Sequence, residues 1–204
     1  MSDTLNERLN KILPRITSDD FLSGSGIGNE IAFYIFDYLP EDELRVRDHL
    51  RTLLEHLPKQ KPGLRFRHIN LFDLVLGYLQ SRDLLEKVLE KGRRRGDAAL
   101  KHALAGPLHS EKLAAYFDET VQPRQQELVL VSGVGSVYPL VRTSGLLSNL
   151  HGVMGSTPLV LFYPGRYDQL TLCLFGKVAL SASFEGGGKV KKSEHYYRAF
   201  KLVS

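Results

Sequence analysis

The sequence predicts an α/β fold: a single domain with a mostly parallel, helix-covered open sheet and an antiparallel edge strand, spanning residues 1–204. Two observations lead to this fold class. Short apolar runs alternate with amphipathic helical patterns, which is the order of βαβ units. In addition, the length of 204 residues and the composition, 43% hydrophobic and 25% charged, are those of one globular domain with its own core.

Residues 1–30 are expected to form an N-terminal helix followed by a glycine-rich loop. The helical spacing is carried by Leu5, Leu9, Ile12 and Leu13. Pro14 is expected to end this helix. The glycine-rich loop at 24–28 precedes the first strand, so it presents no helix N-terminus to a phosphate.

The first strand is expected at 31–36, because a continuous apolar run is typical of a strand buried on both faces. Pro40 and the acidic residues after it open a helix that is expected to end before Pro58. Asp37, at the end of the strand, is the most enzyme-like single residue of the chain. We interpret it as a cap of the following helix.

The next segment alternates apolar and polar residues and predicts a second strand at 64–69. Asn70 is expected to cap the helix that follows this strand. A further helix is expected to end near Gly92. Residues 97–121 then carry two short helical patterns, separated at Gly106-Pro107.

The second half of the chain continues the alternation, with strands expected at 128–131 and 159–163 and a helix between them at 140–151. Pro164-Gly165 is expected to form a turn. The fifth strand, at 170–175, follows too closely for a parallel crossover, so this pair is expected to be antiparallel. Residues 185–193 are rich in glycine and lysine and are expected to form a flexible loop.

The chemistry-bearing residues predict neither an enzyme nor a metal site nor a cofactor. The seven histidines are scattered, and His49 and His56 have no acidic residue at metal-ligand spacing. Cys173 lies inside an apolar run and is interpreted as a small buried residue. No Gly-x-Ser-x-Gly elbow presents a serine nucleophile.

A small-molecule pocket, if this protein has one, is expected beyond the carboxyl ends of the parallel strands. Those ends supply Asp37, His68, Asn70, Ser132, Gly133, Pro164 and Gly165.

The segment Gly133-x-Gly135 follows a strand and precedes a helix, which is the context of a dinucleotide-binding loop. However, Tyr138 occupies the third glycine position, and Tyr163 ends the next strand where a ribose-binding acid would be needed. The simpler interpretation is a tight turn from strand to helix. A degenerate nucleotide-binding domain without a phosphate loop remains an alternative.

The net charge of +4 is unevenly placed, because residues 1–62 carry −3 and residues 125–204 carry +4. Two basic clusters could contact the phosphates of a nucleic acid without reading its bases: Arg93, Arg94 and Arg95, and Lys189, Lys191 and Lys192. We interpret the arginines as the solvated end of a helix, where cations complement the helix dipole. A nucleic-acid-binding subunit remains the second functional hypothesis.

The location expected for this chain is the cytoplasm. A single cysteine fits a reducing compartment. The first residues lack the basic start and apolar stretch of a signal peptide. No apolar run reaches the roughly 18–20 residues of a membrane helix, so no membrane partner is expected.

Several segments together resemble the BrxB family, the small component of bacterial BREX phage-defence systems. The most specific are the segment Gly-x-Gly-x-x-Tyr-Pro-x-x-Arg at 133–142 and the segment Tyr-Tyr-Arg-Ala-Phe at 196–200. Weaker matches occur in order along the chain, at 35–40 with Glu43 and Arg47, and at 69–71, 146–150, 162–165 and 174–176.

The resemblance implies membership of a multi-protein defence assembly that contains an ATPase, a methyltransferase and a phosphatase-like protein. The family that the chain resembles has no established catalytic activity, which agrees with the absence of a catalytic pattern in the sequence. The function expected is therefore that of an adaptor, with the phosphatase-like component PglZ as its direct partner and the BREX ATPase as a further candidate.

Aromatic residues, prolines and arginines near the expected strand ends form a candidate surface for that partner, since such side chains are common in binding hot spots. The surface comprises Tyr138, Pro139, Arg142, Pro164, Arg166 and Tyr167. Phe162 lies nearby but is interpreted as part of the core, because it stands in the middle of a strand.

Overall fold

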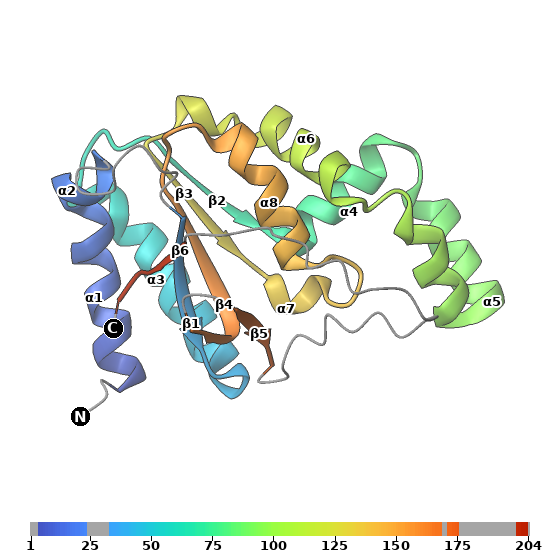
Figure 1. The fold of residues 1–204 in the computed structure, drawn as a ribbon, viewed down its shortest axis with the longest axis horizontal. Coiled ribbons are helices and arrows are strands. Elements are labelled where there is room, and N and C mark those ends of the chain that lie inside the picture. The colour runs from blue at the N-terminus through green and yellow to red at the C-terminus, as the bar shows by residue number, and fades with distance from the viewer. Residues whose placement is uncertain (1–3, 24–32, 169–170, 176–198, 204) are drawn as a thin grey trace, which may run out of the picture.

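The computed structural model describes residues 4–23, 33–168, 171–175 and 199–203 (Figure 1). The helices are α1 (Leu5–Thr17), α2 (Asp19–Leu22), α3 (Glu43–Gln60), α4 (Leu71–Ser81), α5 (Leu85–Ala105), α6 (Ser110–Val121), α7 (Val134–Val137) and α8 (Thr143–Met154). The strands are β1 (Phe33–Tyr38), β2 (Phe66–Asn70), β3 (Leu128–Ser132), β4 (Leu159–Tyr167), β5 (Leu172–Leu174) and β6 (Ala199–Lys201). Two short 3₁₀ helices, Pro40–Asp42 and Pro123–Gln125, complete the described elements.

The strands form one open sheet in the order β2-β3-β4-β1-β6, in which all neighbours are parallel. Strand β5 lies off this path and pairs with the end of β4 in the antiparallel direction. The predicted α/β class, the mostly parallel sheet and the antiparallel pair are therefore confirmed. Strand β6 was not predicted, because three residues of mixed character carry no alternation that marks a strand.

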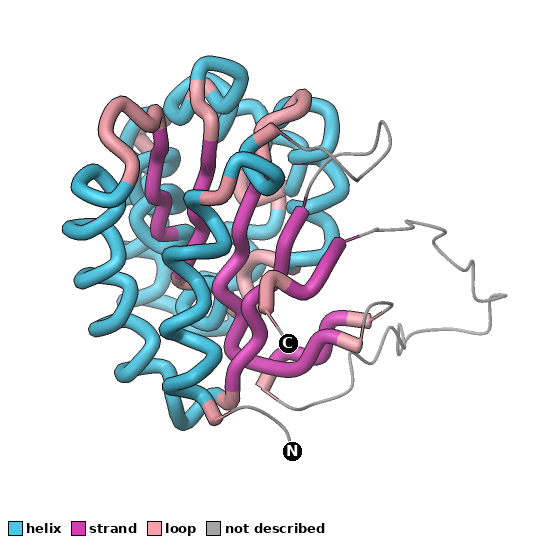
Figure 2. Tube along the Cα trace, turned by 90° about the vertical axis from the view of Figure 1, so that its left-hand side faces the viewer, coloured by secondary structure: helices cyan, strands magenta, loops and turns pink. Residues whose placement is uncertain are grey.

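Each face of the sheet is covered by its own set of helices. Helices α1 and α3 pack on one face, whereas α4, α6 and α8 pack on the other (Figures 1 and 2). The alternation of side chains along β3 supplies both cores, since Leu128 and Leu130 belong to one cluster and Val129 and Val131 to the other. Every residue of β1 and β3 is buried, as expected for central parallel strands.

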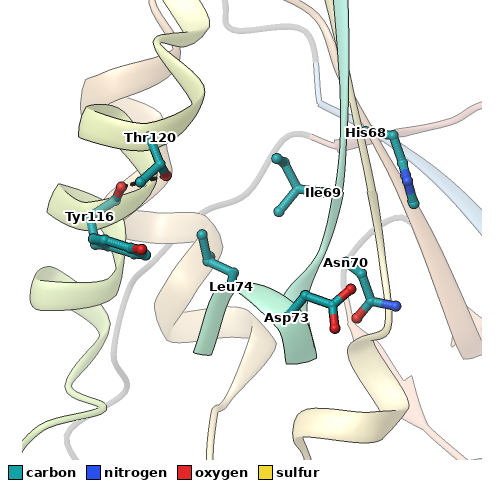
Figure 3. A pocket seen from close by; sticks show the side chains of 7 residues that line it. All are labelled: His68, Ile69, Asn70, Asp73, Leu74, Tyr116 and Thr120. Atoms are coloured by element: carbon teal, nitrogen blue, oxygen red, sulfur yellow. Dashed lines mark hydrogen bonds between the residues drawn. The ribbon is translucent and has the colours of Figure 1, made fainter. Parts of the chain in front are cut away.

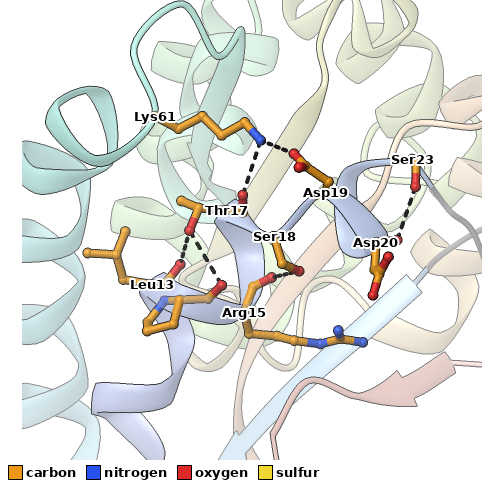
Figure 4. A network of polar contacts seen from close by, with 9 residues as sticks. Leu13, Arg15, Thr17, Ser18, Asp19, Asp20, Ser23 and Lys61 are labelled. Atoms are coloured by element: carbon orange, nitrogen blue, oxygen red, sulfur yellow. Dashed lines mark hydrogen bonds and ion pairs between the residues drawn. The ribbon is translucent and has the colours of Figure 1, made fainter.

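Two prolines that were expected to end helices lie inside them, so these two predictions are wrong. Helix α1 continues past Pro14 to Thr17, and α3 continues past Pro58 to Gln60. A proline removes one helical hydrogen bond, but the residues after it keep theirs, so a last turn can still form. In α1 this turn is supported from outside: Lys61 donates to the Thr17 carbonyl at 3.2 Å and to Asp19 at 2.5 Å (Figure 4).

The expected turn at Pro164-Gly165 is also wrong, because both residues lie within β4. Strand β5 pairs there, with Gly165 opposite Leu174. A side chain at position 165 would overlap the backbone carbonyl of Cys173, so the close approach of the two strands requires this glycine.

The helix expected to end near Gly92 continues to residue 95, and the chain then breaks its helical course at Gly96, with φ 77° and ψ −179°. The second limb, 97–105, runs to the expected boundary at Gly106. Residues 185–193, predicted to form a loop, lie outside the described residues, as does the predicted glycine-rich loop within 24–30.

Candidate functional site at the carboxyl edge of the sheet

Asp37, at the carboxyl end of β1, is buried and holds several elements together. It accepts hydrogen bonds from Arg8 of α1 at 2.8 Å and from the backbone N–H of Tyr167 at 3.0 Å. Lys201 of β6 donates to the same carboxylate at 3.4 Å. The interpretation of Asp37 as a cap of the next helix is therefore wrong. The carboxylate instead joins β1 to α1, β4 and β6.

Two further polar residues at the strand ends have structural partners. His68 of β2 contacts Ser132 of β3 at 2.8 Å between Nε2 and Oγ. Burial lowers the pKa of His68 below its usual range, while the charge of Asp73 opposes this shift. Asn70 accepts a hydrogen bond from the backbone N–H of Phe72 at 2.9 Å, so the predicted helix cap is confirmed.

These polar residues border a shallow cavity of about 280 Å³ at the outer edge of β2. Figure 3 shows His68 on one side of this strand, and Tyr116 and Thr120 of α6 on the other. The lining comprises His68, Ile69, Asn70, Asp73, Leu74, Tyr116 and Thr120. Two of these residues, His68 and Asn70, were expected to border a pocket at the strand ends.

The contact between His68 and Ser132 resembles a base next to a nucleophile, but it lacks the rest of a catalytic site. A triad needs a third group that orients the base through a hydrogen bond. Among the described residues, no carboxylate is hydrogen-bonded to His68, and the Ser132 side chain is buried. This arrangement is that of a polar tie between two neighbouring strands.

Large apolar side chains are exposed beyond the carboxyl ends of several strands, and we call them the edge patch. The patch comprises Leu39 after β1, Phe72 after β2, Tyr138 after α7 and Phe175 after β5, each between 38% and 55% exposed. Tyr138 and Phe175 form an edge-to-face pair with ring centroids 5.8 Å apart. Edge-to-face packing is a favoured geometry for aromatic pairs, and tyrosine is enriched among the residues that carry the binding energy of protein interfaces.

The residues predicted to bind a partner separate into two groups. Tyr138, Pro139, Arg142 and Arg166 are exposed. Pro164 and Tyr167 are buried, and the Tyr167 hydroxyl donates to the Ala199 carbonyl at 2.8 Å. The expectation that these two residues contribute to an exposed surface is therefore wrong, because β4 continues through them into the core.

Sequence reasoning missed Phe175, Phe72 and Leu39. Phe175 follows the antiparallel strand, and its backbone N–H donates to the Pro164 carbonyl at 3.0 Å, which places it beside Pro164 of β4. The signal that could have found all three is their position, because each is a large apolar residue at or shortly after the end of an expected strand or helix cap. Periodicity does not separate such residues from core residues.

The glycine loop at 133–135 offers no phosphate cradle. Helix α7, which follows it, is a single four-residue turn. A side chain at Gly133 would overlap Asn70, and one at Gly135 would lie 3.1 Å from Phe175 and 3.3 Å from Pro164. Since neighbouring side chains fill the space above the loop, the structure agrees with the interpretation of a tight turn from strand to helix.

The remaining candidates lie away from this edge or outside the described residues. Arg93, Arg94 and Arg95 are exposed at the break in α5. Lys189, Lys191 and Lys192 fall outside the described part of the chain. Within that part, no three potential ligands cluster as a metal site would require, and no helix is both long and apolar enough to span a membrane. Cys173 is half-buried, rather than fully buried as expected.

The fold and this edge define an open-sheet α/β protein whose strand ends carry an exposed aromatic surface. A sequence model of the family described as "BREX protein BrxB" matches residues 67–202. The chain is 41% identical to a BREX protein BrxB of Escherichia coli O9:H4 (strain HS), over 98% of this chain and 92% of that protein. It is 37% identical to a BREX protein BrxB of Bacillus cereus (strain H3081.97), over 98% and 97% of the two chains. No solved structure matches this chain.

The chain therefore belongs to the BrxB family of BREX components. The resemblance inferred from the sequence segments is confirmed.

Proposed function

We propose that this protein is a non-catalytic, cytoplasmic adaptor that bridges other components of its BREX system, with the phosphatase-like protein PglZ as the direct partner and the BREX ATPase as a further candidate. The observation that carries the proposal is the exposed aromatic pair of Tyr138 and Phe175 at the carboxyl edge of the sheet. In many α/β enzymes this edge binds the substrate, but here the polar side chains at the strand ends form hydrogen bonds to neighbouring elements of the fold.

The backbone that carries Tyr138 is fixed, although its side chain is 53% exposed. Val137 and Val141, on either side of it in sequence, are both buried. The backbone N–H of Val141 donates to the Val137 carbonyl at 3.0 Å, which closes the turn between them. A side chain held on a fixed turn loses little conformational entropy when a partner covers it, and this favours tight binding.

Two exposed arginines support the same use. Arg142 follows Tyr138 by four residues, and Arg166 lies in β4 opposite Cys173 of β5. Apolar and aromatic side chains at the centre of an interface, with charged groups at its rim, are the usual composition of a binding surface between proteins. A partner that presents an apolar pocket with acidic residues around it fits this surface.

The proposal is tested by capturing PglZ of the same system with the full-length chain. The variant Tyr138→Ala/Arg142→Ala should keep its circular dichroism spectrum and Tm but lose capture, since removing central anchors commonly costs about 2 kcal/mol or more. A matched control, Leu89→Ala/Arg51→Ala, removes one exposed apolar and one exposed arginine side chain away from the edge patch.

The control should capture PglZ as the wild-type chain does. Equal capture by the edge variant and the wild type would place the interface elsewhere. Unfolding of the edge variant would show that these residues belong to the core.

A further inference from the structure

Helix α5 is a hairpin of two helical limbs. At Gly96 the backbone takes φ 77° and ψ −179°, a region open in practice to glycine alone. Beyond this break the second limb folds back onto the first. The closeness of the two limbs is shown at Gly92, where an added Cβ would lie 3.4 Å from the Leu100 side chain. In an unbroken helix, residues eight positions apart would be about 12 Å apart along the axis. The hairpin lies at the end of the molecule farthest from α1 (Figure 1).

The turn of this hairpin is strongly basic, and we call residues 93–96 the hairpin tip. Arg93, Arg94 and Arg95 occupy the last turn of the first limb and are all exposed. Arg94 pairs with Glu90, but this pair is exposed and therefore weak. Arg93 and Arg95 have no ion-pair partner among the described residues. Along the whole helix, six basic side chains stand against three acidic ones.

Cations in the last turn complement the dipole of the first limb. The dipole effect needs only a nearby positive charge, so it does not occupy the guanidinium N–H donors of Arg93 and Arg95, which have no acceptor within the described part of the protein. Guanidinium groups bind phosphate through two parallel hydrogen bonds, so an exposed cluster of arginines fits a row of phosphates.

We propose that the hairpin tip binds the phosphodiester backbone of a nucleic-acid duplex, without reading its sequence. The only apolar side chains within residues 90–99 are those of two alanines, so the tip lacks the apolar centre of an interface between proteins. Helix α5 also contains no Phe, Tyr or Trp on which unpaired bases could stack. The interaction that the tip can offer is therefore the attraction of its positive charges to phosphates, which suits a duplex whose bases stay paired.

The test measures binding of the full-length chain to labelled duplex DNA and duplex RNA by fluorescence anisotropy at several salt concentrations. In the variant Arg93→Gln/Arg94→Gln/Arg95→Gln, affinity at about 50 mM salt should fall by at least tenfold, and the slope of log K against log salt should decrease by about 2–3. The two duplexes show whether the backbone contacted is that of DNA, of RNA or of both. Binding of either by the tip supports the proposal.

A matched control removes three exposed positive charges elsewhere, in Arg51→Gln/Lys59→Gln/Arg67→Gln, and should change the slope much less. A second measurement needs no substitution: a duplex with neutral methylphosphonate linkages should lose binding to the wild-type chain. If the tip variant binds as the wild type does, or if the wild type binds neither duplex, the proposal is wrong. If the tip variant keeps duplex binding but loses capture of PglZ, the tip binds an acidic protein surface instead, and the proposal is equally overturned.

Discussion

The edge patch and the hairpin tip are both exposed, but their chemistry is opposite. The edge patch presents aromatic and apolar side chains, of which Tyr138 and Phe175 are in direct contact. The hairpin tip presents three arginines and no large apolar side chain. Apolar contact favours proteins, whereas exposed guanidinium groups favour phosphates. The two proposed surfaces therefore suit two kinds of partner, as the proposed bridging role requires.

The two surfaces also differ in how the fold supports them. The edge patch lies where parallel strands end, and Asp37, at the end of one of these strands, joins four elements. The hairpin tip depends on local features, namely the backbone of Gly96 and the packing of Leu100 against Gly92. Damage to one surface should therefore leave the other intact.

The largest effect is expected from Asp37→Ala. This change leaves Arg8 and Lys201 without their carboxylate and the Tyr167 N–H without its acceptor, so the free energy of unfolding should fall by about 3 kcal/mol. Chemical denaturation measures the loss. Asp37→Asn keeps an acceptor and should lose less. Asp48→Ala, which removes a fully exposed pair with Arg51, should change stability by less than about 1 kcal/mol.

The folded fraction of Asp37→Ala should still bind nucleic acid, because the hairpin tip makes none of these contacts. A loss of duplex binding equal to that of the arginine variant would show that the two surfaces are not separate.

Phe175→Ala should affect the edge patch alone. The ring is 38% exposed and packs edge-to-face on Tyr138, so its loss should weaken capture of PglZ by about 2 kcal/mol, or roughly thirtyfold, without unfolding the chain. Titration of the partner measures the change. Leu89→Ala removes an apolar side chain of similar exposure, 39%, from the first limb of α5 and serves as control. Equal losses in both variants would contradict a defined edge surface.

Gly96→Ala should affect the hairpin tip alone. A side chain at φ 77° and ψ −179° is strained by about 1–2 kcal/mol, although no neighbouring atom would clash with it. The hairpin should open more often, which faster hydrogen exchange of the α5 amides would report. Gly106→Ala, at a helical backbone conformation with open space around it, should leave that exchange unchanged or slower. Loss of PglZ capture in Gly96→Ala would contradict the separation.

The strands and their order of alternation could be predicted because apolar runs such as 128–131 are short, β-branched and bounded by turn residues. The pairing of β5 followed from loop length alone. The role of Asp37 could not be predicted, since its partners lie 29, 130 and 164 residues away. Tyr167 was wrongly expected to be exposed for a related reason. The sequence does not reveal that β4 continues past Pro164 and Gly165, because this continuation depends on pairing with β5.

The candidate surfaces were partly foreseen. Tyr138, Pro139 and Arg142 lie on an exposed turn because the glycines before them direct the chain over the strand ends. The hairpin was missed, because a glycine inside a helical pattern gives no direction for the limb that follows. Its contact with Leu100 depends on the backbone angles of one residue.

The smallest effect expected is a pH dependence centred on His68, below the edge patch. Because burial lowers the pKa of His68 in the folded chain, the unfolded chain binds a proton first as the pH falls. The stability that the neutral ring contributes is therefore complete above the unfolded pKa of about 6.5 and is lost as the pH falls below it.

The variant His68→Gln keeps a polar side chain within reach of Ser132, and it should flatten the decline of Tm between about pH 6.5 and 5. His49 of α3 also has its pKa lowered by burial, so His49→Gln should flatten the same decline of Tm by a separate amount. Because His68 joins β2 to β3 and does not touch the hairpin tip, the slope of duplex binding against salt should be the same for His68→Gln and the wild type. A change in that slope would show that the sheet edge and the hairpin respond together.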